Sequence, residues 1–148
     1  MQKGDNMRRA WYGGLFICMC CLTLGMGTMG GQSSIKTPEP DVNYMITLVD
    51  QADVSMELEK FSCEGLTYLT GQLGKADLSI DFEKIRSILF VVADDTAKAL
   101  VTLDNHQQVE LDVEKNTPCY GVSTFAEVRI EIKDIKKIVL HGKKPIVE

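Results

Sequence analysis

Two stretches of the chain, IDFEKIRSILF at Ile80–Phe90 and IEIKDIKKIVL at Ile130–Leu140, carry the same apolar pattern fifty residues apart. Their charged residues differ, but their apolar residues keep the same spacing: Ile80, Phe82, Ile85, Ile88 and Phe90 correspond to Ile130, Ile132, Ile135, Ile138 and Leu140. The alternation that opens each stretch indicates a strand with one face in water. The spacing then widens to three, which predicts one helical turn before a second strand.

The match extends upstream at a different offset. Residues 45–60, MITLVDQADVSMELEK, correspond to residues 100–115, LVTLDNHQQVELDVEK, at an offset of 55, and Cys63 corresponds to Cys119 at 56. The offset then falls to 50, so the first copy has six additional residues before Leu78. The glycine-rich stretch Thr70–Lys75 is the candidate for this additional loop.

These patterns predict an all-β fold made of two tandem copies, residues 44–92 and 99–148, with residues 93–98 as the connection. A unit of about 45 residues is marginal for an independent core. We therefore expect the copies to pack as a pseudo-symmetric pair, or to merge into one β-sandwich or barrel. The order hairpin, loop, strand, helical turn, strand resembles that of small SH3-like or Sm-like barrels, and such a resemblance carries no function.

One strand is expected to differ from the others. The stretch LFVV, Leu89–Val92, is apolar at every position rather than alternating. Strands of this composition are typical of sheets covered on both faces. We therefore predict that Leu89–Val92 is buried on both sides.

Residues 1–30 have the layout of a secretory signal. Three basic residues precede the apolar run Trp11–Leu24, and glycine and small polar residues follow it. The pattern predicts a signal helix that is removed on export to the periplasm or the extracellular space. An uncleaved membrane anchor is the alternative. Residues 31–43 contain Pro38 and Pro40 and are predicted to form an extended linker.

Cysteine usage fits this location. After signal removal, Cys63 and Cys119 would be the remaining cysteines. In an exported protein a disulfide between them is a reasonable hypothesis. The alternative is two separate buried thiols, one in each copy.

The charge balance limits the class of partner. The chain has 16 Lys and Arg against 21 Asp and Glu, which argues against nucleic acid, because phosphate binding requires clustered basic residues. The C-terminal end is locally basic and is a candidate for weak contact with an acidic lipid or polymer through Lys136, Lys137, Lys143 and Lys144.

No catalytic, metal or cofactor motif is recognisable. The two histidines, His106 and His141, lack a nucleophile or a ligand cluster at a known spacing, and the stretch GQLGK fails the spacing of a phosphate loop. The residues nominated for ligand contact are those of the candidate loop, namely Gly71, Gln72, Gly74 and Lys75.

The sequence therefore predicts a non-enzymatic binding or structural accessory module of the cell envelope, whose partner is a protein or an envelope polymer. One alternative is a ligand-binding protein or enzyme with a site between the two copies, near residues 70–75. The other alternative is an envelope domain that contacts the membrane through its N-terminal segment.

Overall fold

The computed structural model describes residues 35–145, which belong to one compact unit. The ten strands are β1 (Tyr44–Asp50), β2 (Ser55–Cys63), β3 (Tyr68–Leu73), β4 (Ala76–Asp81), β5 (Ile85–Ala93), β6 (Thr96–Leu103), β7 (Gln108–Val113), β8 (Pro118–Val122), β9 (Glu127–Glu131) and β10 (Ile135–Lys143). Two one-turn 3₁₀ helices, η1 (Phe82–Lys84) and η2 (Ile132–Asp134), precede β5 and β10. The all-β prediction is confirmed, whereas the signal helix predicted for residues 1–30 lies outside the described residues.

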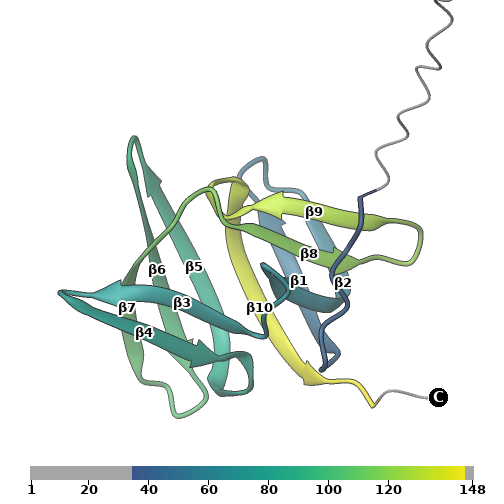
Figure 1. Ribbon diagram of the computed structural model, residues 1–148, viewed down its shortest axis with the longest axis horizontal. Helices are drawn as coiled ribbons and strands as arrows, with labels where there is room; N and C mark the ends of the chain where they lie inside the picture. The colour runs from purple at the N-terminus through teal and green to yellow at the C-terminus, as the bar shows by residue number, and fades with distance from the viewer. Residues whose placement is uncertain (1–34, 146–148) are drawn as a thin grey trace, which may run out of the picture. The chain divides into compact units, whose positions relative to one another are not determined.

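The strands form one antiparallel sheet in the order β4-β3-β7-β6-β5-β10-β1-β2-β8-β9. Strands β5 and β10 pair at its middle, as Figure 1 shows. We call β5 with β6, β7, β3 and β4 the β5 half, and β10 with β1, β2, β8 and β9 the β10 half. In the stretch from Ile35 to Pro145, no helix has the length and apolar character that crossing a membrane requires.

The β5 half is nested within the β10 half along the chain. Its strands are consecutive in sequence, whereas the β10 half takes two strands from before them and three from after them. The hairpin β1–β2 pairs with β10 and β8, and the hairpin β6–β7 pairs with β5 and β3. Within residues 35–145, the predicted tandem copies therefore do not form separate barrels, because each hairpin finds its hydrogen-bonding partners in the other copy.

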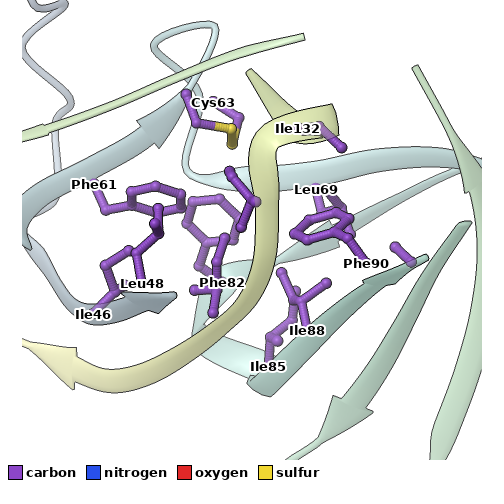
Figure 2. Packing of buried hydrophobic residues seen from close by; sticks show 14 of the residues in the cluster. Ile46, Leu48, Phe61, Cys63, Leu69, Phe82, Ile85, Ile88, Phe90 and Ile132 are labelled. Carbon is purple, nitrogen blue, oxygen red and sulfur yellow. A yellow bond between two sulfur atoms is a disulfide. The ribbon is translucent and has the colours of Figure 1, made fainter. Parts of the chain in front are cut away.

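A single apolar core runs under both halves. Within it the ring of Phe82 stacks on that of Phe61 (Figure 2), and the two ring centroids are 5.6 Å apart. The ring of Phe82 also meets the ring of Tyr44 edge-on, with centroids 5.7 Å apart. Phe82 comes from η1, next to the β5 half, while the other two rings come from the β10 half. Burial of these aromatic rings joins the two halves into one cooperative core.

The predicted helical turns are present. Phe82 begins η1 and Ile132 begins η2, and both side chains are buried. Each turn is tied in the same way to the residue that precedes a strand: Phe82 N donates to Thr67 O, just before β3, at 3.0 Å, and Ile132 N donates to Thr117 O, just before β8, at 3.0 Å. The spacing of three in the sequence thus places one apolar residue of each turn under the sheet.

The prediction that Thr70–Lys75 forms an additional loop is wrong. Residues up to Leu73 continue β3, and Gly74 with Lys75 forms a two-residue hairpin turn to β4. Gly74 has φ 63°, which glycine adopts without steric cost. Gly71 lies where β7 approaches closely, since a Cβ there would be 2.8 Å from the carbonyl oxygen of Asp112. The glycines therefore mark a turn and a strand contact.

The prediction that Leu89–Val92 is covered on both faces is also wrong. Phe90 is buried, but Leu89 is 39% exposed and Val91 is 57% exposed. Val92 is 37% exposed as well, so Phe90 is the one residue of this stretch that reaches the core. The strand β5 lies in an antiparallel sheet with one wet face, and an apolar composition does not by itself place a residue in the core.

Candidate functional site

An open groove of about 680 Å³ lies over β3, β4 and β7. Its polar lining comes from alternate residues of the strands and from the residue after β7: Tyr68, Thr70, Gln72, Asp77, Ser79, Asp112 and Glu114. These side chains project from the face opposite Leu69, which is buried in the core. The groove is therefore a feature of the wet face of the sheet.

The groove exists because β7 separates from β3. The only residues paired between these strands are Gln72 and Asp112. Beyond Val113 the chain turns away through a tight turn in which Thr117 N donates to Glu114 O at 3.2 Å. Strand β3 continues in the other direction to Tyr68 without a partner on that side.

The groove is electronegative. Asp77 accepts a hydrogen bond from Gln72 Nε2 at 3.0 Å, and Glu114 accepts one from the main-chain N–H of Asn116 at 3.2 Å. Among the described residues, Asp77, Asp112 and Glu114 take part in no ion pair. Three carboxylates without a cation favour a positively charged ligand.

The ammonium group of Lys98, the residue that pairs with Asp112 across β6 and β7, is engaged elsewhere. Lys98 Nζ lies 2.7 Å from Glu110 Oε1. This hydrogen bond to Glu110 is the main reason that the pKa of Lys98 is raised, and the charge of Asp112 adds to the effect. Lys98 therefore neutralises Glu110 first and leaves the groove with an excess of negative charge.

Two of the four residues nominated for ligand contact reach this groove. Gly71 and Gln72 line it, whereas Gly74 and Lys75 are absent from its lining and form the hairpin turn beyond it. In the part of the chain that the structure describes, no three His, Cys, Asp or Glu side chains are arranged to hold a metal ion. The groove thus offers carboxylate, hydroxyl and amide groups for polar contacts.

The lysines nominated for acidic lipid or polymer are largely paired within the chain. Lys136 forms an ion pair with Asp53, Lys143 Nζ lies 3.0 Å from Glu83, and Lys144 Nζ lies 2.7 Å from Glu59. The fourth, Lys137, projects from β10 opposite Leu89 of β5. The local excess of positive charge in the sequence is therefore offset by carboxylates from other segments.

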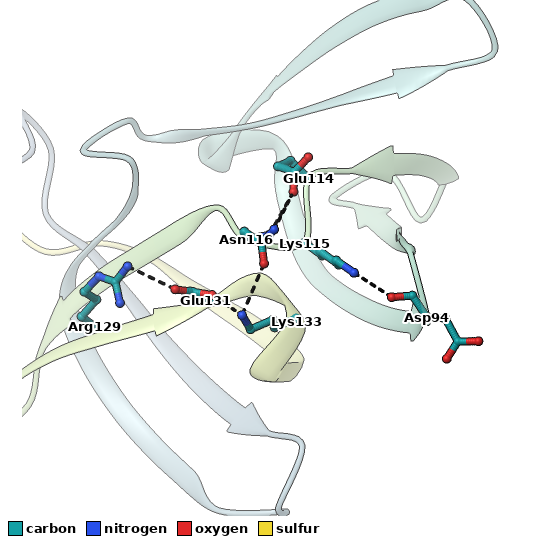
Figure 3. A network of polar contacts seen from close by, with 7 residues as sticks. All are labelled: Asp94, Glu114, Lys115, Asn116, Arg129, Glu131 and Lys133. Atoms are coloured by element: carbon teal, nitrogen blue, oxygen red, sulfur yellow. Dashed lines mark hydrogen bonds and ion pairs between the residues drawn. The ribbon is translucent and has the colours of Figure 1, made fainter.

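A second polar cluster holds the connection from β7 to β8 (Figure 3). Lys133 of η2 donates to Asn116 Oδ1 at 3.3 Å and pairs with Glu131 at 2.6 Å. The hydrogen bond from Lys133 is the main cause that lowers the pKa of Glu131. On the other side, Lys115 Nζ donates to the carbonyl oxygen of Asp94 at 2.6 Å. The cluster positions the turn that closes one end of the groove.

Comparison with known proteins places the chain in a family. A family model described as "Uncharacterised protein" matches residues 40–143, a span that contains all ten strands. The chain belongs to this family. An "Uncharacterized protein" of Aquifex aeolicus (strain VF5) is 32% identical over 108 residues, which are 71% of this chain and 82% of the relative. No solved structure matches the chain.

The family match covers the groove as well as the core. Sequence reasoning missed Tyr68, Thr70 and Asp112 as parts of one site, because they lie on strands whose contact is not local in sequence. The available signal was the alternation of Tyr68, Thr70 and Gln72, which indicates a strand face rather than a loop.

Proposed function

We propose that this protein is an exported, non-enzymatic binding module of the cell envelope. The observation that carries the proposal is the disulfide between Cys63 and Cys119. The two residues are direct partners across β2 and β8, which supports the pairing predicted from the sequence. Disulfides persist in oxidising compartments, and this one accords with the signal-like layout of residues 1–30.

The binding role is supported by the groove of the β5 half. It combines three carboxylates with hydroxyl and amide groups on an open face of the sheet. The repeated apolar pattern of the sequence keeps its spacing while its charges change, which is typical of a shared scaffold and carries no function of its own.

Fractionation of cells that produce the full chain with a C-terminal tag tests the proposal. We expect the protein outside the cytoplasm and resistant to thiol alkylation at Cys63 and Cys119 until reductant is added. N-terminal sequencing of that fraction separates a cleaved signal from a retained membrane anchor. Recovery in the cytoplasm with both thiols alkylated would refute the export proposal.

A further inference from the structure

The two halves of the sheet differ at one strand edge, which is covered by a neighbouring strand in the β10 half and open in the β5 half. In the β10 half, β2 continues to Cys63 and covers the side of β8 that faces away from β9. Ser62 pairs with Tyr120, and Glu64 N donates to the carbonyl oxygen of Pro118 at 2.8 Å. The main-chain groups of β8 on that side are therefore satisfied within the chain.

In the β5 half the corresponding side of β3 is open. Phe82 N donates to Thr67 O at 3.0 Å, and Thr67 continues the register in which Tyr68 pairs with Asp81. Because hydrogen-bonded and non-hydrogen-bonded pairs alternate in an antiparallel ladder, the N–H and C=O groups of Tyr68 and Thr70 point away from β4 and into the groove. Within residues 35–145, neither residue has a main-chain partner in β7 or in the turn after it.

The two observations together describe a missing strand segment. Leu69 pairs with Ile80 as Cys119 pairs with Ile130, so β3 and β8 are counterparts in the sheet. Where β8 has Ser62 and Glu64 beside it, β3 has the groove. An unpaired strand edge of this kind is a template for an added strand.

We propose that the groove binds an extended, positively charged peptide segment of a partner protein, which pairs with β3 at Tyr68 and Thr70. Main-chain hydrogen bonds to these residues supply affinity, and Lys or Arg side chains of the peptide meet Asp77, Asp112 and Glu114. This inference rests on the proposed binding function and names the class of its partner.

The test uses the full, oxidised chain and a library of pentapeptides with Lys, Glu, Thr or Val at each position. We expect Lys-containing members to bind and to slow amide hydrogen exchange at Tyr68 and Thr70. Exchange at Tyr120 is the internal control, because its main chain is already paired with Ser62. N-methylation of the peptide nitrogen that faces Thr70 removes one hydrogen bond and is expected to weaken binding about tenfold.

The charge requirement is tested separately with the double variant Asp112→Asn, Glu114→Gln, whose exposed side chains keep their shape. We expect it to lose affinity for Lys peptides while its thermal unfolding stays that of the wild type. The proposal is overturned if no peptide in the library protects Tyr68 and Thr70, if N-methylation leaves affinity unchanged, or if Glu peptides bind as tightly as Lys peptides.

A second copy of the chain at β3 would also overturn the proposal, and would be detected as a dimer by light scattering, with protection of the same two amides in the absence of peptide. Failure of peptide binding leaves the export proposal intact, because cell fractionation and thiol alkylation do not depend on the groove.

Discussion

Tyr44 joins the core to the first helical turn. Its ring is buried against Phe82, and its hydroxyl donates to Asp81 Oδ1 at 3.2 Å. Asp81 in turn accepts from Glu83 N at 2.8 Å and so caps η1. One phenol thus connects β1 with a turn almost forty residues further along the chain.

This contact predicts a pH dependence of stability. Burial, followed by the charge of Asp81, raises the pKa of Tyr44 to about 12, whereas an unfolded tyrosine titrates near 10. Between these values the unfolded chain loses the proton first, so stability falls as pH rises from about 10 to about 12. We expect the free energy of unfolding of Tyr44→Phe to fall less steeply over this interval than that of the wild type in urea titrations. Equal slopes would contradict the assignment.

Ser62 is the one buried side chain in the described residues whose polar atom lacks a hydrogen-bond partner. A buried hydroxyl without a partner costs roughly 1–3 kcal/mol. We expect Ser62→Ala to raise the free energy of unfolding by about 1 kcal/mol in chemical denaturation. Ser123→Ala is the matched control and should lower it, since Ser123 Oγ both donates to Ala126 O and accepts from Ala126 N. A destabilised Ser62→Ala protein would show that the hydroxyl is satisfied.

At the scale of elements, the disulfide links β2 covalently to β8 within the β10 half. Cys63 and Cys119 are 56 residues apart, and a loop of that length predicts stabilisation by about 4 kcal/mol. We expect reductant to lower the urea midpoint of the wild type by the corresponding amount. The double variant Cys63→Ala, Cys119→Ala is the control and should not respond to reductant. Identical midpoints for oxidised and reduced wild type would contradict this role.

Strand β3 lies close to β7 at Gly71. A Cβ at this position would lie 2.8 Å from Asp112 O and 3.0 Å from Leu111 Cβ, so the two strands would have to separate. We expect Gly71→Ala to cost about 1–3 kcal/mol in urea denaturation. Gly74→Ala is the comparison, because its surroundings are open and only its φ of 63° opposes a side chain. Wild-type stability of Gly71→Ala would mean that the strands adjust freely.

Register explains why the sequence match was displaced. Leu48 pairs with Ile138, and Val101 pairs with Ile88. Because Ile88 and Ile138 are equivalent in the two copies, the structural equivalent of Leu48 is Val101. The sequence match, with its offset of 55, instead aligns Leu48 with Leu103, which is two residues further along the chain. A slip of two residues keeps every side chain on the same face, so alternation alone could not detect it. The sequence match likewise aligns Cys63 with Cys119, whereas in the structure the two residues are cross-strand partners and are not equivalent positions.

At the scale of the whole molecule, the exchange of hairpins makes folding depend on the entire chain. The turn Asp94–Asp95 lies between β5 and β6. We expect reduced fragments 1–94 and 95–148 to be unfolded separately by circular dichroism, and to regain the sheet when mixed, because β1–β2 requires β10 and β8. The reduced intact chain controls for loss of the disulfide. A folded fragment on its own would contradict this interdependence.

Local patterns predicted most of the elements. The alternation at Ile80–Phe82 and the spacing of three that follows are properties of neighbouring residues, and both appear in the structure as β4 and η1. Glycine-rich and all-apolar stretches were misread, because their roles depend on a distant strand: Gly71 is opposite β7, and Leu89 is opposite Lys137. The sequence indicated two of the groove residues, Gly71 and Gln72, but not the carboxylates of Asp77, Asp112 and Glu114.

The sequence by itself determined the all-β class, the helical turns and the pairing of Cys63 with Cys119 as a hypothesis, since periodicity and cysteine number are encoded locally. Only the tertiary structure decided which hairpin pairs with which strand, where the register falls and why β3 lacks a neighbour at Tyr68 and Thr70. The physical reason is that strand pairing is a contact between distant segments, and many pairings satisfy the same alternation equally well.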